Sequence, residues 1–193
     1  MKVHVVYAYP LQDGLSAHIH RTVVDSLQQA GHTVDDLDLY AEGFDPVLSA
    51  EDREIYHDTP ENRRRVQPYV DRLLAAEGLV FCHPVWNFGW PAILKGYIDR
   101  VFLLDVSFKL EASRFSPGLT NLRKMATVTT YGVHRWQAFF VSDPPRANAT
   151  RFLPIVSKPG TANRYIALYG INTIKPGQAE RFLGRVRREM LAF

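Results

Sequence analysis

Residues 84–103 read Pro-Val-Trp-Asn-Phe-Gly-Trp-Pro-Ala-Ile-Leu-Lys-Gly-Tyr-Ile-Asp-Arg-Val-Phe-Leu. The apolar run at residues 79–82 before them predicts a buried strand. Pro91 predicts the first turn of a helix, where a missing N–H is tolerated. The loop between them carries Trp86, Phe88 and Trp90, and loops at the carboxyl ends of strands in open α/β sheets bind ligands. A tight turn with core aromatics is the alternative. We favour ligand binding, because exposed loops seldom hold so many apolar groups.

Strand and helix patterns alternate along the chain. The apolar patterning predicts strands at residues 3–9, 33–40, 78–83, 124–130 and 164–169. It predicts helices at residues 15–30, 49–57, 66–76 and 91–104, and a last helix from about residue 179. This alternation is typical of an α/β fold with a parallel sheet covered by helices on both faces. Five strands at this spacing favour the order 2-1-3-4-5, in a single domain that spans residues 1–193.

Composition excludes several classes of protein. A net charge of +3 is too small to indicate nucleic-acid binding. Cys82 is the only cysteine, which excludes an internal disulfide and favours a reducing cytoplasm. No apolar run reaches the roughly 20 residues of a membrane helix, and no signal-peptide pattern opens the chain. The seven histidines show no metal-ligand spacing, so no metal is expected, and motifs for classical dinucleotide or nucleoside-triphosphate binding are missing.

The loop at residues 9–18, after the first strand, is a candidate phosphate site. Gly14 permits a sharp approach of the backbone, and Ser16 is a good N-cap for the helix that follows. Free N–H groups and the helix dipole attract phosphate to such a place. A plain capping role for Ser16 is an equally favoured alternative. Asp13 would repel a phosphate, so we expect it to face solvent.

The segment at residues 84–103 resembles the strand–loop–helix of the NAD(P)H:quinone oxidoreductases. These are flavoproteins with a flavodoxin-like fold, such as DT-diaphorase, the drug-activity modulator and the potassium-efflux ancillary proteins. The positions that agree are Pro84, Phe88, Gly89, Pro91, Ala92, Leu94, Lys95, Gly96, Asp99, Arg100, Val101 and Phe102. Asn87 stands where the family often has Trp. The resemblance extends to the first strand and its loop, to residues 43–46 and to residues 129–132, and it implies the flavodoxin-like fold.

The resemblance also implies three groups of flavin contacts. The expected cofactor-binding residues are Tyr9, Ser16, Ala17 and His18 at the phosphates; Pro84, Val85, Trp86, Asn87 and Phe88 around the ring; and Thr129, Thr130, Tyr131 and Gly132 at its pyrimidine side. Of the first group only Ser16 agrees with the family, since His18 replaces Asn and Tyr9 replaces His. Tyr131 replaces a glycine of the family's Thr-Thr-Gly-Gly.

Tyr131 and His134 are the candidate catalytic residues. Either side chain is able to hydrogen-bond a quinone oxygen or to donate a proton during reduction. A surface position for His134, beside Arg135, is an equally favoured alternative. Arg146 follows Asp-Pro-Pro, where a turn is favoured over contact with a cofactor phosphate.

The function implied by the resemblance is that of an NAD(P)H-dependent flavoenzyme. Its bound FAD or FMN would pass hydride to quinones or similar acceptors by a ping-pong mechanism. The relatives are dimers, so we expect a homodimer, with an exposed helix face near Tyr97 and Phe102 as a candidate interface. One alternative is a flavodoxin-type electron carrier, which the basic balance disfavours because true flavodoxins are strongly acidic. Another is a regulatory flavoprotein subunit of a membrane transporter.

Overall fold

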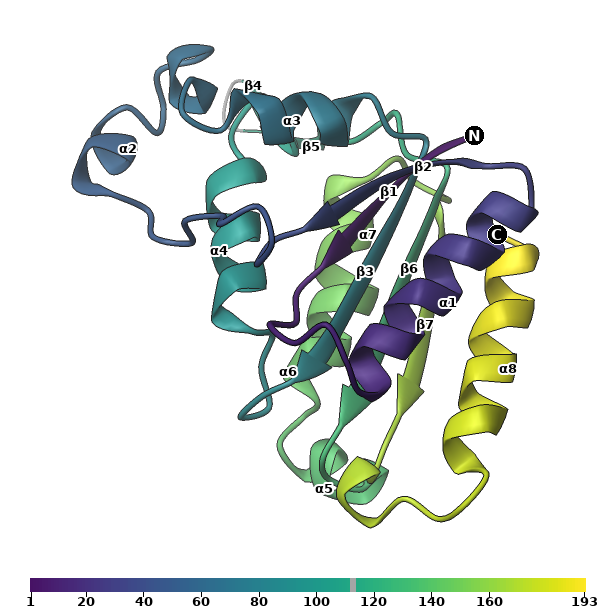
Figure 1. The fold of residues 1–193 in the computed structure, drawn as a ribbon. Coiled ribbons are helices and arrows are strands. Elements are labelled where there is room, and N and C mark those ends of the chain that lie inside the picture. The colour runs from purple at the N-terminus through teal and green to yellow at the C-terminus, as the bar shows by residue number, and fades with distance from the viewer. Residues whose placement is uncertain (112–113) are drawn as a thin grey trace.

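Five parallel strands form the centre of the molecule (Figure 1). The computed structural model describes residues 1–111 and 114–193. The strands of the sheet are β1 (Lys2–Tyr7), β2 (Thr33–Asp38), β3 (Gly78–Val85), β6 (Lys124–Tyr131) and β7 (Ala162–Leu168). Their order is β2-β1-β3-β6-β7, which is the predicted order 2-1-3-4-5 once the strands of the sheet are counted alone. The flavodoxin-like architecture expected from the sequence is therefore confirmed.

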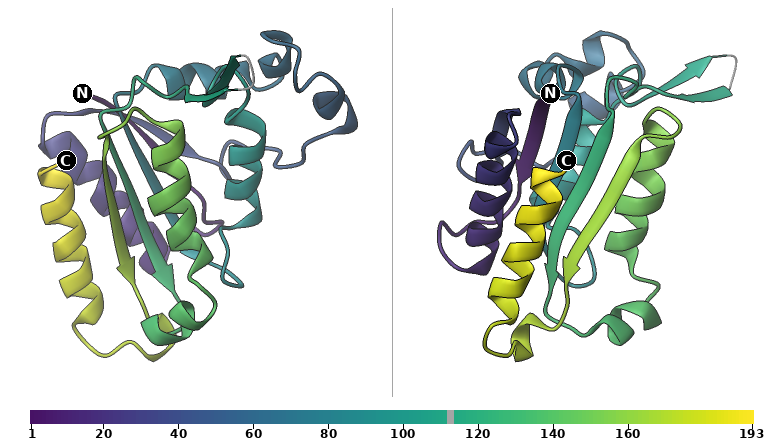
Figure 2. Two further views of the ribbon diagram at one scale, coloured as in Figure 1. Left: turned by 180° about the vertical axis from the view of Figure 1, so that it is seen from behind. Right: turned by 90° about the vertical axis from the view of Figure 1, so that its right-hand side faces the viewer.

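Helices cover both faces of the sheet (Figures 1 and 2). One face carries α1 (Leu15–Gln29) and α8 (Gln178–Leu191). The opposite face carries α3 (Gln67–Leu74), α4 (Ala92–Val101) and the helical run made of α6 (Pro144–Ala147), the π-helical turn η2 (Asn148–Phe152) and α7 (Leu153–Val156). The shorter elements are α2 (Ala50–Glu54), η1 (Glu61–Arg63), α5 (Arg135–Phe140), η3 (Ile171–Thr173) and the antiparallel hairpin β4 (Phe108–Glu111) with β5 (Arg114–Pro117).

Successive side chains of β1 enter two separate cores, because a strand alternates its side chains between faces. Val3 and Val5 pack with Ile19 of α1 and Phe182 of α8. Val6 packs in the other core, which α3 and α4 close. Sheets buried on both sides need strands that are apolar nearly throughout, and β1 and β3 meet that condition.

The predicted interface on α4 is wrong. Tyr97 and Phe102 are 0% and 4% exposed, and both belong to the core under α4. The reason lies on β1, where the buried ring of His4 places Nε2 3.2 Å from the Tyr97 hydroxyl. Phe102 packs between Phe81 of β3 and Phe152. Both side chains are therefore unavailable to a second copy.

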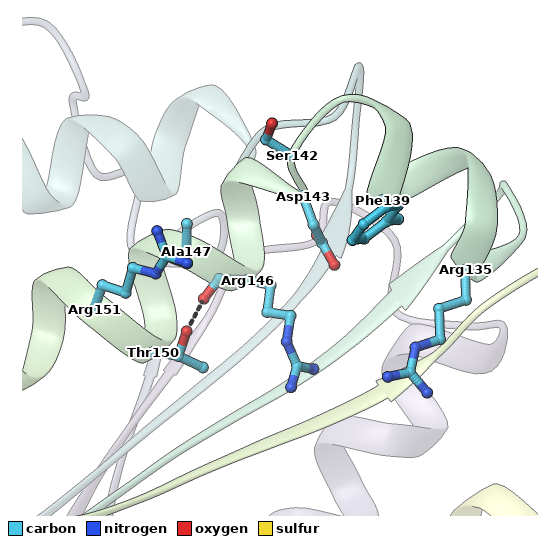
Figure 3. A pocket seen from close by; sticks show the side chains of 8 residues that line it. All are labelled: Arg135, Phe139, Ser142, Asp143, Arg146, Ala147, Thr150 and Arg151. Carbon is cyan, nitrogen blue, oxygen red and sulfur yellow. Dashed lines mark hydrogen bonds between the residues drawn. The ribbon is translucent and has the colours of Figure 1, made fainter.

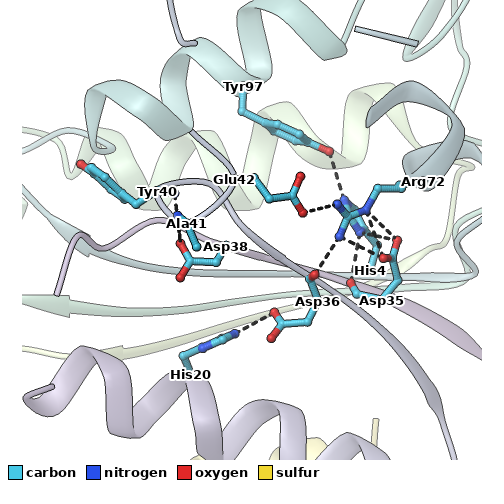
Figure 4. A network of polar contacts seen from close by, with 10 residues as sticks. All are labelled: His4, His20, Asp35, Asp36, Asp38, Tyr40, Ala41, Glu42, Arg72 and Tyr97. Atoms are coloured by element: carbon cyan, nitrogen blue, oxygen red, sulfur yellow. Dashed lines mark hydrogen bonds and ion pairs between the residues drawn. The ribbon is translucent and has the colours of Figure 1, made fainter. Parts of the chain in front are cut away.

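A network of charges ties β1 and β2 to α3 (Figure 4). His4 Nδ1 lies 3.0 Å from Asp35 Oδ2, and Arg72 of α3 pairs with the same carboxylate at 3.0 Å. Arg72 also pairs with Glu42 at 2.7 Å. Hydrogen bonds from His4 first, and then from Arg72, hold the pKa of Asp35 well below its usual range. The edge strand β2, which is polar in sequence, is anchored by these contacts.

The two ends of the chain meet at His32. The N-terminal ammonium lies 3.5 Å from His32 Nδ1, and His32 Nε2 lies 3.1 Å from the carbonyl oxygen of Phe193. This place is at the amino ends of the strands, as Figure 1 shows. Within the described residues, every helix is too short or too polar to cross a bilayer.

Candidate functional site

The carboxyl ends of β1, β3 and β6 bring the three predicted loops to one edge of the sheet. Val85 pairs in register with Tyr131, so the loops after β3 and β6 start side by side. The N–H of Ala8 donates to the carbonyl of Cys82 at 3.0 Å, which joins the end of β1 to β3. The rings of Tyr9 and Trp86 lie 6.4 Å apart, from centroid to centroid. The first two loops are thus in direct contact.

The first loop ends in a helix start with free backbone donors. Gly14 is the N-cap of α1, with φ of 87°, and a Cβ there would meet nothing within 4 Å. In the described chain, the first N–H of α1 that donates to a backbone carbonyl belongs to His18, which bonds to Gly14 at 3.0 Å. The N–H groups of Leu15, Ser16 and Ala17 therefore remain for a ligand, and a helix N-terminus of this kind favours an anion.

Ser16 does not cap the helix, which was the alternative to phosphate binding. It is the second residue of α1, and its side chain is half-buried. The left-handed φ at Gly14 starts the helix two residues earlier, which puts the Ser16 N–H among the free donors. Asp13 is exposed, as expected, and its Oδ1 accepts the N–H of Gly14 at 2.7 Å. His18 is exposed on the first turn of α1.

Side chains from three elements hold the first loop in place. Arg21 of α1 donates to the carbonyl of Gln12 at 3.1 Å, and the Gln12 amide donates to Asp38 Oδ2 at 3.2 Å. The Tyr7 hydroxyl donates to the carbonyl of Leu11 at 3.4 Å. Burial raises the pKa of Tyr7 above its ordinary value, so the phenol stays protonated as this donor. A loop fixed in this way is ready for a ligand before one binds.

The second loop is a tight turn with an unusual residue in it. Trp86 and Gly89 exchange two backbone hydrogen bonds, of 3.1 and 2.8 Å, and the residues between them, Asn87 and Phe88, have φ of 49° and 57°. Positive φ at both central positions defines a type I′ turn, which prefers Asn and Gly. Asn87 suits it, whereas Phe88 stores strain of about 1–3 kcal/mol. Such strain is concentrated at functional sites, so we read this turn as part of the site.

The three aromatics of this loop have different positions. Trp90 is buried against Phe81 and His83 and belongs to the core, which was the alternative interpretation. Trp86 is 40% exposed, and Phe88 is half-buried. Only the latter two are therefore placed to cover a flat ligand. Pro84 is buried and Val85 is half-buried at the end of β3, so they support the turn from below.

At the end of β6, a ligand would reach the backbone and not the side chains. Thr129 and Thr130 lie inside β6, not in a loop, and are 1% and 2% exposed. Among the described residues, neither hydroxyl has a hydrogen-bond partner. Gly132 follows, and a Cβ there would come within 2.9 Å of the Asn172 amide, so only glycine fits without a shift. The threonine hydroxyls were expected to bond the flavin, but both are buried within the strand, on opposite faces of the sheet.

Tyr131 was expected beside the flavin, but its side chain is also buried. It is 0% exposed, and its hydroxyl donates to Asp143 Oδ1 at 2.6 Å and contacts the Tyr165 hydroxyl. The Tyr169 hydroxyl donates to Asp143 Oδ2 at 3.0 Å, and its ring stacks on that of Tyr131 at 4.3 Å. Burial raises the pKa of Tyr131 well above its ordinary value. The phenol is thus held in a closed network.

Asp143 is the functional-site residue that the sequence analysis missed. It has φ of 43°, in the left-handed region, and it lies at the start of α6, where the Asp-Pro-Pro sequence indicated only a turn. Its partner Tyr131 ends β6, and its other partner, Tyr169, lies just after β7 and 26 residues along the chain. The tyrosines themselves were a usable signal, since a buried phenol requires a partner.

His134 is exposed and forms the N-terminal capping box of α5 with Gln137. Its backbone N–H donates to Gln137 Oε1 at 2.9 Å. Its Nε2 lies 3.4 Å from the Thr173 hydroxyl, on the turn after β7. The ring therefore stands at the rim of the site with a structural partner on one side, and its proton-donating role stays a prediction.

The arrangement fits a phosphorylated flat cofactor. Three free N–H groups and the open space at Gly14 suit a phosphate, and the exposed face of Trp86 lies beside the same loop. A backbone donor requires no particular side chain, so Asn87 in the turn is compatible with a flavin ring. In the part of the chain that the structure describes, no group of acidic, histidine and cysteine side chains is arranged to hold a metal.

Comparison with known proteins agrees with this geometry. A family model described as "Flavodoxin-like fold" matches residues 1–143. The "uncharacterized NAD(P)H oxidoreductase YcaK" of Escherichia coli is 36% identical over 105 residues, or 52% of each chain. "FMN-dependent NADH:quinone oxidoreductase 2" of Hahella chejuensis is 28% identical over 90% of this chain and 86% of its own. The crystal structure of Smu.1420 from Streptococcus mutans superposes with a TM-score of 0.85 at 30% identity, over 100% of both chains. The chain spans 52–58% of the length of three of the curated relatives that it matches.

Proposed function

This chain belongs to the family of proteins with a flavodoxin-like fold, and we propose that it is an FMN-dependent NAD(P)H oxidoreductase that reduces quinones or similar two-electron acceptors. One observation carries the proposal. The free N–H groups of Leu15, Ser16 and Ala17 follow the loop of Tyr9, whose ring lies 6.4 Å from that of the exposed Trp86. The names of the relatives, which are NAD(P)H and quinone oxidoreductases, support the same reaction class.

FMN is favoured over FAD on the same grounds. The helix start offers one anion site of three donors, which matches a single terminal phosphate. Two relatives are named as FMN-dependent quinone oxidoreductases. The donor is a reduced nicotinamide, NADH or NADPH.

A bound flavin would supply reversible two-electron chemistry between the nicotinamide and the acceptor. The chain's own residues perform the remaining tasks. The N–H groups of α1 would hold the flavin's phosphate, and the type I′ turn would support its ring. Trp86 and Phe88 exclude water from one side and give flat acceptors a surface to stack on. One stacking position for both donor and acceptor requires them to bind in turn, which is a ping-pong order.

Purification and two measurements test the proposal. The protein should carry a yellow chromophore that denaturation releases as FMN, identified by chromatography against FMN and FAD standards. It should also oxidise NADH or NADPH in the presence of menadione. A bound flavin without such oxidation would indicate an electron carrier, and a protein that neither carries nor binds flavin would contradict the proposal altogether.

The homodimer remains a prediction, and the two residues first considered for its interface, Tyr97 and Phe102, are buried. Light scattering of the purified protein at several concentrations measures its molecular mass, and the mass of a single chain at every concentration would contradict the homodimer.

A further inference from the structure

A pocket of about 440 Å³ lies between α5 and the helical run that begins with α6 (Figure 3). Its volume is in the range of about 300–1,000 Å³ that small-molecule sites occupy. Three of the side chains that line it are arginines, Arg135, Arg146 and Arg151, and one is a carboxylate, Asp143. The proposed flavin reaction assigns nothing to this pocket.

The one carboxylate of the pocket, Asp143, does not pair with its arginines. Both oxygens of Asp143 accept tyrosine hydroxyls, from Tyr131 and Tyr169, so the carboxylate is turned toward the sheet. Among the residues that the structure describes, none of the three guanidinium groups forms an ion pair. Three positive charges beside one negative charge leave an excess of two. A dianion matches that excess, whereas a single carboxylate would match half of it.

Arg146 is already held in a binding position. Its guanidinium lies over the ring of Tyr165, with Cζ 5.1 Å from the ring centroid. Stacking uses the flat face of the group and leaves the N–H groups on its edge to donate in the plane. The carbonyl of Arg146 also accepts the Thr150 hydroxyl at 2.8 Å, which fixes the backbone. A fork of in-plane N–H donors is the geometry that recognises phosphate oxygens.

Arg135 and Arg146 form a pair of arginines in the pocket. In Figure 3 it extends from α5 in the same direction as Arg146 extends from α6, with Asp143 and Phe139 between them. The Phe139 ring is 80% exposed and adds an apolar wall. The pocket therefore joins a cationic end to an aromatic surface, and its volume exceeds what a lone inorganic ion would fill.

We propose that this pocket binds the phosphate monoester of a small organic molecule, with Arg135 and Arg146 on the phosphate and Phe139 against the organic part. Two sources share this chemistry: the 2′-phosphate of NADPH and a separate phosphorylated metabolite. The binding step itself does not depend on the proposed flavin reaction.

Calorimetry on the cofactor-loaded protein tests the site. The probe is adenosine 2′,5′-bisphosphate, with 5′-AMP as the reference that lacks the 2′-phosphate and inorganic phosphate as the free ion. Loss of a charge-assisted pair weakens such binding by about tenfold or more, so R135Q/R146Q should bind the bisphosphate at least that much more weakly. R135Q alone keeps Arg146 over Tyr165, so a loss of binding in this variant is not explained by a disturbed fold around that ring. The control is R185Q, since Arg185 is an exposed arginine of α8 that carries the same charge.

Equal affinity of R135Q, R135Q/R146Q and R185Q for the bisphosphate would overturn the proposal. The proposal would also be overturned if the wild type bound none of the three probes, which are the bisphosphate, 5′-AMP and inorganic phosphate. Steady-state kinetics separates the two sources. A several-fold rise in KM for NADPH but not for NADH in R135Q/R146Q, with the bisphosphate competing against NADPH, identifies the donor's 2′-phosphate. Unchanged KM values in R135Q/R146Q, together with non-competitive binding of the bisphosphate to the wild type, identify a separate metabolite. A wild type that binds the bisphosphate yet oxidises neither nucleotide would contradict the flavin reaction and leave the pocket standing.

Discussion

Ser16 shows how one backbone N–H is able to determine a binding site. Its side chain was expected either to bind a phosphate or to cap the helix, but its place in the second position of α1 makes its N–H one of three free donors. Replacing the hydroxymethyl group by a longer carboxylate puts a negative charge where the phosphate should lie, without removing any donor.

We therefore expect Ser16→Glu to abolish most of the bound flavin. The chromophore content of the purified variant, measured by absorbance after denaturation, gives the result. Gln28→Glu adds the same charge near the far end of α1, where Gln28 is exposed, and should leave the flavin content unchanged. A full complement of flavin in the Ser16 variant would remove the helix start from the site.

Trp86 is the second residue that the proposal depends on. Trp86→Ala removes the exposed ring beside Tyr9 while keeping the backbone turn. Stacking between aromatic groups is worth about 0.5–1.5 kcal/mol beyond the area buried, so the dissociation constant of the flavin or the KM for menadione should rise several-fold. Trp90→Phe serves as a comparison, because that ring is in the core: it should lower the melting temperature instead. Unchanged flavin affinity and KM in Trp86→Ala would assign that ring to surface packing.

At the scale of elements, the Asp143 network fixes α6 against β6 and β7. Its members come from three elements, so removing one partner leaves another polar group buried and unpaired. Such a loss costs about 1–3 kcal/mol. Asp143→Ala should reduce the free energy of unfolding by that amount, and Tyr131→Phe by about 1 kcal/mol.

Chemical denaturation of the two single variants and the double variant gives the coupling between them. Residues that share a hydrogen bond show interaction energies of about 0.5–3 kcal/mol, so the double variant should lose less than the sum of the two. Strict additivity would mean that the bond between Tyr131 and Asp143 contributes nothing in solution.

The elements also show what sequence patterns are able to predict. Both long helices and all five sheet strands were predicted because their apolar spacing repeats over many residues, as at Ile19, Val23 and Leu27 of α1. The paired strands β4 and β5 and the short helices between residues 135 and 156 were not. Short elements have few repeats of any pattern, and contacts with distant residues decide their structure.

The same reason explains the errors at the site. The position of Ser16 depended on a left-handed φ at Gly14, and that of Tyr131 depended on Asp143 and Tyr165, which only the fold brings together. The exposed face expected on α4 failed because the pairing of Tyr97 with His4 spans 93 residues. Local patterns located the loops correctly, while the orientation of their side chains came from long-range contacts.

For the whole molecule, one buried histidine predicts how stability depends on pH. His83 is 4% exposed, its Nδ1–H donates to the Pro84 carbonyl at 2.9 Å, and burial lowers its pKa to about 4. In the unfolded chain its pKa is about 6.5. Between these values the unfolded state binds the extra proton, so the stability that His83 contributes is complete above about pH 6.5 and falls as the pH drops toward 4.

The free energy of unfolding, measured by denaturant titration at several pH values, should fall across that window. His83→Gln removes the titrating ring and should flatten the fall, whereas replacing the exposed His57 by Gln should leave it unchanged. An equal slope in wild type and His83→Gln would mean that the imidazole titrates normally. Asp35, whose pKa is lowered, adds a second loss of stability at lower pH, below about 4.

The meeting of Met1 and Phe193 at His32 has a practical consequence for protein engineering. Both ends leave the fold at the amino edge of the sheet, and the ligand loops lie at the carboxyl edge. A fused domain, an affinity tag or a surface linker at either end would therefore extend away from the loops. Because the ends are adjacent, a short peptide would also join them, and new ends opened in an exposed loop would give a circular permutant with the same sheet.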